Sequence, residues 1–224
     1  MLGSGLIGAN WATLFLSKGA NVTLYDPQKT ALEKTRAVIA SAWQDLKKLD
    51  YSIGRIPDER LLITENLRQA CENTDWIQEN SPDQLEVKTK LISEVEKYVK
   101  ANVPIASSTT ALLPSEIQKN MHYPSRFLVG HPFNPPHLIP LLEIVAGMHT
   151  DPDLPQKAAQ FYESFGHEVI IAKREVVGHI ANRLNAALYR EVVHMVQADI
   201  ANIEDIDRAI ANGPGLRWAF LGPN

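Results

Sequence analysis

A chain of 224 residues is long enough to bury one large hydrophobic core, or the cores of a large and a small domain. Hydrophobic residues make up 45% of it and charged residues 21%, which is typical of a globular protein. A net charge of −4 without basic blocks argues against nucleic-acid binding, and no apolar run approaches the roughly 18 residues of a membrane span.

The cysteine content excludes two kinds of stabilising site. Cys71 is the only cysteine, so the chain cannot form an internal disulfide and has no cysteine cluster for structural zinc. We predict no metal site. No leader pattern precedes Gly3, and we therefore expect a cytoplasmic protein.

The chain opens on a glycine-rich loop with GxGxxG spacing, made up of Gly3, Ser4, Gly5, Leu6, Ile7 and Gly8. A helical pattern follows at residues 9–18, and a short strand at 22–25 leads to Asp26, 18 residues after Gly8. This order of loop, helix, strand and acid is the dinucleotide-binding fingerprint. It predicts that the loop and the helix N-terminus bind the diphosphate, and that Asp26 binds the ribose hydroxyls.

The residues around Asp26 also indicate which dinucleotide is bound. Pro27 follows, and no arginine stands at the strand end, which favours NAD over its 2′-phosphorylated relative. The alternative is a chance glycine-rich turn, with Asp26 capping a turn ahead of Pro27. Only two residues precede Gly3, so we expect a shortened first strand or a fragment of a longer chain.

Helices and strands alternate through the next hundred residues. This alternation predicts a parallel, doubly wound Rossmann-type sheet. The expected helices are at 28–49, 66–72 and 85–100, and the expected strands at 61–63, 75–79 and 104–106.

Two loops follow strands of this sheet, where ligands bind in open α/β folds. Glu79 stands at the end of one strand, either facing the cofactor or as a carboxylate in water. The hydroxyl-rich loop of Ser107, Ser108, Thr109 and Thr110 follows the next. Capping of the helix near residue 113 is the favoured interpretation of this loop, with contacts from Ser107 to the cofactor and from Ser108 to the substrate as the alternative.

The stretch from 126 to 147 carries the predicted chemistry. An apolar strand at 127–129 leads into a proline-rich loop with His131 and Asn134, and a second apolar run at 138–145 contains Glu143. An ionisable group in such a run needs a partner, because burying it unpaired costs several kcal/mol. We predict that Glu143 holds His131 as a general base. The alternative is a loop histidine and an edge-strand charge.

The pattern changes after a helix at 153–165 and a strand at 167–172, because only helices follow, at 177–198 and 203–211. We place a boundary after Arg174, between a Rossmann domain at 1–174 and the start of an all-helical domain at 175–224. Asn182 either binds a substrate oxygen or lies on the helix surface. Trp218 and Phe220 belong to a core or hinge, or face a cationic substrate group.

Several motifs together resemble the 3-hydroxyacyl-CoA dehydrogenase family. They are the glycine loop, Gln78-Glu79-Asn80-Ser81-Pro82, Ser107-Ser-Thr-Thr110, His131-Pro-Phe-Asn134-Pro, Glu143 and Asn182-Arg-Leu. The resemblance covers essentially the whole chain. Within the family it is closest to the branch of carnitine 3-dehydrogenase and lambda-crystallin, an L-gulonate 3-dehydrogenase.

The resemblance implies roles for individual residues. His131 would take the hydroxyl proton, Glu143 would orient it, and Asn182 would fix the substrate oxygen. Asn134 would contact the cofactor. Thr110 stands where these enzymes usually carry serine, and keeps the donor while adding a methyl group. The remaining six histidines are expected to be structural or exposed.

The family pattern also differs from this chain in two respects. Val177-Gly178-His179 stands where relatives usually have Pro-Gly-Phe. Family members carry more chain at both ends, including helices that complete the second domain and a homodimer interface.

The resemblance implies NAD-dependent oxidation of a 3-hydroxy acid, foremost carnitine. L-gulonate and a 3-hydroxyacyl-CoA are the alternative substrates, and the chain has no obvious basic cluster for the phosphates of CoA. A third alternative is an NAD-binding or crystallin-like protein without turnover.

Overall fold

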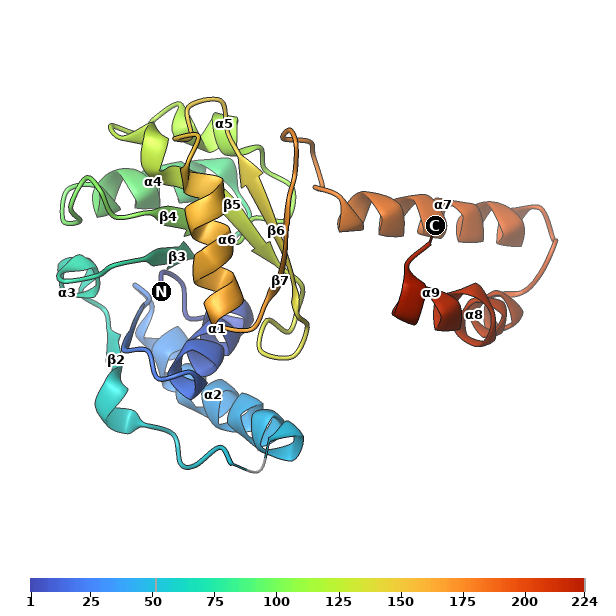
Figure 1. Ribbon diagram of the computed structural model, residues 1–224, viewed down its shortest axis with the longest axis horizontal. Helices are drawn as coiled ribbons and strands as arrows, with labels where there is room; N and C mark the ends of the chain where they lie inside the picture. The colour runs from blue at the N-terminus through green and yellow to red at the C-terminus, as the bar shows by residue number, and fades with distance from the viewer. Residues whose placement is uncertain (51, 224) are drawn as a thin grey trace. The chain divides into compact units, whose positions relative to one another are not determined.

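The computed structural model describes residues 1–50 and 52–223. They form two compact units, Met1–His179 and Ile180–Asn224. The first unit carries the sheet (Figure 1), and the second is helical. The domain boundary that the sequence predicts after Arg174 stays a prediction. Among the described residues, no helix is long and apolar enough to cross a membrane.

The first unit alternates strands and helices as its sequence predicts. Its strands are β1 (Val22–Tyr25), β2 (Leu61–Thr64), β3 (Ile77–Glu79), β4 (Ile105–Ser107), β5 (Phe127–Pro132), β6 (Leu141–Ala146) and β7 (Glu168–Ile171). Its α-helices are α1 (Leu6–Ser17), α2 (Lys29–Leu49), α3 (Leu67–Cys71), α4 (Leu85–Val95), α5 (Pro114–Gln118) and α6 (Leu154–Ser164). Short 3-10 turns, η1 (Asp58–Arg60) and η2 (Pro124–Arg126), precede β2 and β5.

Leu2 connects two parts of the sheet. It forms parallel bridges to Tyr25 on one side and to Glu79 on the other, so that it lies between β1 and β3. β1 pairs in parallel with β2, and the remaining strands follow in the order β3-β4-β5-β6-β7. The residues before the glycine loop therefore occupy the central position expected of a shortened first strand.

The sheet is parallel up to β5 and then reverses. β6 runs antiparallel to β5, and β7 runs parallel to β6. This reversal follows from a short connection, because adjacent antiparallel strands can be joined directly, whereas parallel strands need a crossover. It places the start of β6 beside the end of β5, where His131 lies.

Helices cover both faces of the sheet, as expected of a doubly wound fold. One core packs α1, α2 and α6 against Ala106 and Leu128. The other packs α3, α4 and α5 against Ile105 and Phe127, the neighbours of those two residues in the same strands. Since successive residues of a strand face opposite sides, β4 and β5 contribute to both cores. In Figure 1, α6 crosses in front of the strands.

The second unit contains α7 (Ala181–Gln197), α8 (Ile203–Asn212) and α9 (Pro214–Leu221). The predicted start of its first helix at 177 is wrong. Gly178 and His179 have φ of 76° and 51°, in the left-handed region, so a right-handed helix cannot pass through them. α9 was not predicted, because Pro214 and Gly215 look like a loop; Pro214 occupies the first turn, where its missing N–H is tolerated.

Candidate active site

The glycine loop has the geometry that a dinucleotide diphosphate requires. Gly3 has φ of 89°, and a Cβ there would lie 2.7 Å from the Asn80 carbonyl oxygen. A Cβ at Gly8 would lie 2.0 Å from the Gly3 carbonyl oxygen, whereas one at Gly5 would meet nothing within 4 Å. The first and third glycines thus permit a tight turn, and the second leaves open space at the start of α1. The residues present fit the cofactor.

Asp26 is tied to this loop by its carboxylate. Its Oδ2 accepts hydrogen bonds from the Ser4 amide at 2.9 Å and the Ser4 hydroxyl at 3.1 Å. Its Oδ1 accepts one from the Gln28 amide at 2.9 Å. A carboxylate has about four acceptor positions, so the half-exposed Asp26 retains capacity for a ribose hydroxyl.

Glu79 belongs to a buried ion pair. Lys88 Nζ lies 2.9 Å from its Oε2, and the two side chains are 1% and 0% exposed. Ser107 donates its hydroxyl to the same oxygen at 2.6 Å, and the Ser81 amide donates to Oε1 at 2.6 Å. Any contact of Glu79 or Ser107 with the cofactor would have to share these bonds, and both contacts stay predictions.

The hydroxyl of Ser108 is fully engaged with protein groups. It accepts from Gln78 Nε2 at 2.8 Å and from Trp11 Nε1 at 3.2 Å, and donates to Asn80 Oδ1 at 2.7 Å. A hydroxyl has one donor and two acceptor positions, and all three are used. The predicted substrate contact of Ser108 would have to displace one of them.

Asp83 holds the end of the hydroxyl-rich loop. Its Oδ2 accepts from the Thr110 amide at 3.0 Å, and its Oδ1 accepts from the Thr109 hydroxyl. Thr109 in turn accepts from the Leu112 amide at 3.1 Å. Thr109 therefore stabilises the turn before α5, whereas the expected capping of that helix is wrong, because its N-cap is Leu113 and it has no side-chain cap. Thr110 is exposed and its hydroxyl remains available for the role that the family resemblance implies.

His131 and Glu143 form the hydrogen-bonded pair that the sequence predicts. They lie opposite each other in the β5–β6 register, and His131 Nδ1 is 2.8 Å from Glu143 Oε2. Their side chains are 6% and 0% exposed. Because the carboxylate can only accept, Nδ1 carries the proton, and in the neutral ring Nε2 carries the lone pair that a general base needs.

A buried network behind this pair fixes the strand that carries the base. Gln78 Nε2 donates to the Gly130 carbonyl at 3.2 Å, next to His131, as well as to Ser108. Gln78 Oε1 accepts from the Tyr162 hydroxyl. Burial raises the pKa of Tyr162, so that the hydroxyl stays protonated and donates. One side chain, Gln78, thereby links the loop of the base to the hydroxyl-rich loop.

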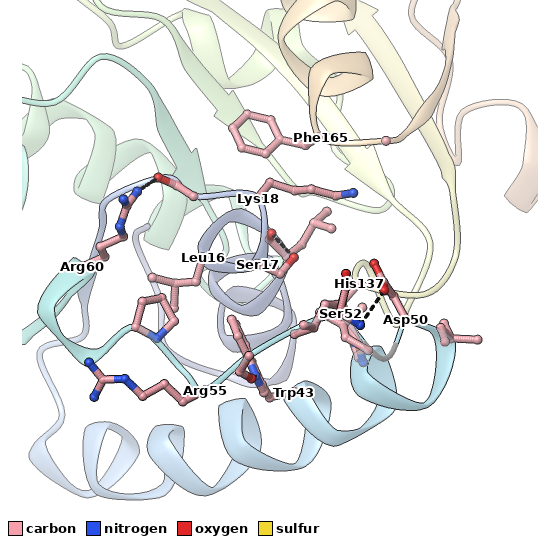
Figure 2. Close-up of a pocket in the computed structure, with 18 residues that line it drawn as sticks. Leu16, Ser17, Lys18, Trp43, Asp50, Ser52, Arg55, Arg60, His137 and Phe165 are labelled. Atoms are coloured by element: carbon pink, nitrogen blue, oxygen red, sulfur yellow. Dashed lines mark hydrogen bonds between the residues drawn. The ribbon is translucent and has the colours of Figure 1, made fainter.

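Asn134 borders a groove of about 550 Å³. The groove runs from the start of α1 at Leu6 along α2 to the loop after β5, and its charged lining residue other than histidine is Asp45. A second cavity of about 510 Å³ lies at the C-terminal ends of α1 and α2 and is lined by Lys18, Asp50 and Arg60 among others (Figure 2). No predicted site residue lines this second cavity.

The remaining predicted site residues belong to the helical unit. Asn182 lies in the first turn of α7 and is half-buried. In α9, Trp218 is half-buried and Phe220 is 82% exposed, so neither belongs to a closed core in the described chain. Their roles in substrate binding stay predictions.

Sequence reasoning missed two residues that the structure places around the predicted loops. Lys88 left a signal, because it stands on the apolar stripe of α4 with Leu85 and Ile92, where a lysine needs a partner. His179 left only its departure from the family's usual Pro-Gly-Phe. It was expected to be structural or exposed, and it is fully buried, with the centroid of its ring 5.0 Å from that of His131.

A Rossmann sheet, an open glycine loop and a buried His–Glu pair together define the class of NAD-dependent dehydrogenases. The chain belongs to the 3-hydroxyacyl-CoA dehydrogenase family. The family's NAD-binding domain matches residues 1–176, and its C-terminal domain matches residues 178–224.

Curated relatives of the chain include L-carnitine dehydrogenases. Those of Streptomyces griseus, Streptomyces coelicolor and Bacillus cereus are 43%, 42% and 40% identical to it. The matches cover 99%, 99% and 100% of this chain, but only 66%, 70% and 68% of the relatives. The chain thus spans about two thirds of their length.

Solved structures agree with the family assignment. The 3-hydroxyacyl-CoA dehydrogenase from Archaeoglobus fulgidus matches with a TM-score of 0.82 at 30% identity, over 99% of this chain and 71% of that one. An NAD⁺-dependent 5-formyl-3-hydroxy-2-methylpyridine 4-carboxylic acid 5-dehydrogenase matches with a TM-score of 0.93 at 27% identity, over 99% and 72%.

Proposed function

We propose that the chain catalyses NAD-dependent oxidation of a 3-hydroxy acid to the 3-keto acid, with L-carnitine as substrate. The observation that carries the proposal is the buried hydrogen bond of 2.8 Å between His131 and Glu143 at the end of β5. NAD, when bound, accepts the hydride from the carbon that bears the hydroxyl.

The proton of the substrate hydroxyl passes to Nε2 of His131. The ring then becomes an imidazolium, and Glu143 stabilises its charge through the bond to Nδ1. Both side chains are almost fully buried, so water screens this interaction little. Thr110 and Asn182 are proposed to bind the substrate oxygen, as the family resemblance implies.

The relatives support carnitine as the substrate, because those reported above are L-carnitine dehydrogenases at about 40% identity. The groove next to Asn134 does not bear on this choice, since Leu6 and Asn134 in its lining are proposed cofactor contacts.

A substrate panel tests the proposal. The chain is incubated with NAD and, separately, L-carnitine, L-gulonate and 3-hydroxybutyryl-CoA, and NADH formation is followed by its absorbance. We expect turnover with carnitine and much slower turnover with the other two. Preference for gulonate or the CoA ester would overturn the substrate assignment. NAD binding without turnover on any of them would favour a non-catalytic protein.

We also propose that the helical unit serves dimerisation. Its helices α7 and α8 enclose a largely apolar pocket of about 690 Å³, and Tyr189 and Ile203 are 68% and 60% exposed. Large exposed apolar side chains in one region are typical of interaction surfaces. Light scattering of the chain extended by the further helices that complete the family's second domain would give the mass of a dimer, whereas the mass of a single chain at all concentrations would contradict this. A cytoplasmic location stays a prediction.

A further inference from the structure

His179 makes a hydrogen bond that fixes which of its nitrogens carries a proton. Its Nε2 lies 3.0 Å from the carbonyl oxygen of Thr109, 70 residues earlier in the chain. A carbonyl oxygen can only accept, so Nε2–H is the donor. The side chain is fully buried, and its Nδ1 has no hydrogen-bond partner in the described part of the chain.

The ring of His179 is neutral at physiological pH. Burial lowers its pKa, the bond to the Thr109 carbonyl partly raises it, and the nearby His131 lowers it further. Glu143 and Asp83 act in the opposite direction on the same group. A neutral ring with the proton on Nε2 keeps its donor fixed toward Thr109.

The same ring lies against the proposed general base. The centroids of the His179 and His131 rings are 5.0 Å apart, and their planes make an angle of 48°. One side chain therefore contacts the base with its ring and the hydroxyl-rich loop with its donor. The backbone amide of His179 donates to the Val176 carbonyl at 3.1 Å, and the residue has φ of 51° after Gly178.

The hydroxyl-rich loop is held at Ser108 by Gln78, Trp11 and Asn80, whereas its later part, Thr109 and Thr110, depends on Asp83 and His179. Asp83 accepts hydrogen bonds from the Thr110 amide at 3.0 Å and from the Thr109 hydroxyl. The carbonyl of Thr109 points to His179 instead. Without that donor, Asp83 would still hold the loop, but nothing described would tie the Thr109 carbonyl to the side of His131.

We propose that His179 is a positioning residue that fixes the distance between the hydroxyl-rich loop and the general base His131. It touches neither substrate nor cofactor in this account and acts through Thr109 and His131. The kinetic part of the inference rests on the proposed function, whereas the structural part does not.

Two variants separate the donor from the ring. In His179→Gln the amide nitrogen reaches about as far as Nε2, so the hydrogen bond to Thr109 is kept and the ring is lost. In His179→Phe a ring of similar size is kept and the donor is lost. His149→Phe is the matched control, because His149 is exposed.

Hydrogen exchange of the peptide covering residues 107–113 gives the readout that needs no turnover. We expect its amide exchange to rise severalfold in His179→Phe, because the loop opens more often, and to stay near the parent value in His179→Gln and His149→Phe. Unchanged exchange in His179→Phe, or equal increases in both His179 variants, would overturn the proposal. A melting curve for each variant shows that the fold is intact.

The turnover number kcat distinguishes a positioning role of His179 from a purely structural one. Loss of one neutral hydrogen bond corresponds to about a 2- to 13-fold effect. We expect kcat for carnitine to fall by that factor in His179→Phe, with the KM for NAD unchanged, and to recover in His179→Gln. A fall in NAD affinity with constant kcat would contradict the inference. If the parent chain turned over no substrate, the proposed function would fail, and the exchange experiment would still decide about His179.

Discussion

Replacing Glu143 with glutamine tests how the acid supports the base. The substitution Glu143→Gln keeps the size of the side chain and its place opposite His131 in the β5–β6 register, but removes the negative charge. The amide oxygen can still accept from Nδ1 at about the observed 2.8 Å. Only the interaction between a carboxylate and the developing imidazolium is lost.

The expected magnitude follows from the change in the type of hydrogen bond. A bond to a charged group contributes about 1.5–3 kcal/mol, and one between neutral groups about 0.5–1.5 kcal/mol. The difference of about 1–1.5 kcal/mol applies when the ring is charged. At 1.36 kcal/mol per factor of ten, kcat should fall about 5- to 13-fold.

The assay is the initial rate of NADH formation with carnitine at saturating NAD. The matched control is Glu168→Gln, an exposed glutamate on β7 of the same sheet, for which no change is expected. NAD affinity and the melting temperature should stay those of the parent. A Glu143→Gln variant with the parent's kcat, or one that loses NAD binding in proportion to its rate, would refute the reasoning.

Three further predictions concern the scaffold. Gly130→Ala would place a Cβ 2.5 Å from the Tyr162 hydroxyl and should lower the free energy of unfolding in urea by about 1–3 kcal/mol. Adding Tyr162→Phe should restore part of this loss, and a Gly130→Ala variant as stable as the parent would contradict the prediction. Lys88→Met leaves Glu79 buried without its cation and should cost about 3–5 kcal/mol, so a parent-like unfolding midpoint would disprove the buried pair. Burial lowers the pKa of His137, His167 and His179 from 6.5, so below that pH the unfolded chain binds protons that the folded chain does not. The melting temperature should therefore stay constant above pH ~6.5 and decrease as the pH falls below it. A melting temperature that is constant down to pH ~5 would contradict the burial of these three histidines.

The order of the elements in the Rossmann unit could be predicted from the sequence, because each leaves a local signal. The strand at 22–25 was predicted with its observed bounds, and the glycine loop indicated where α1 begins. The ends of the elements were harder to predict. α4 ends at Val95 rather than at residue 100, and separate turns follow it in place of the last predicted helical turn.

The pairing of His131 with Glu143 could be predicted because a carboxylate in an apolar run demands a partner. Other parts of the site could not be derived in this way. The partner of His179 is a backbone carbonyl 70 residues away, and a backbone acceptor leaves no trace in the side-chain pattern. The link from Gln78 to Ser108, Gly130 and Tyr162 joins four separate segments, and only the folded sheet brings them together.

The most direct test of the account replaces the base itself. In His131→Gln, NAD should bind with the affinity of the parent, because the glycine loop and Asp26 are untouched, while kcat for carnitine falls about 10²- to 10⁴-fold. Both quantities can be measured on the same preparation, NAD binding by fluorescence titration and turnover by NADH formation. Undiminished turnover in this variant would show that His131 is not the group that takes the proton.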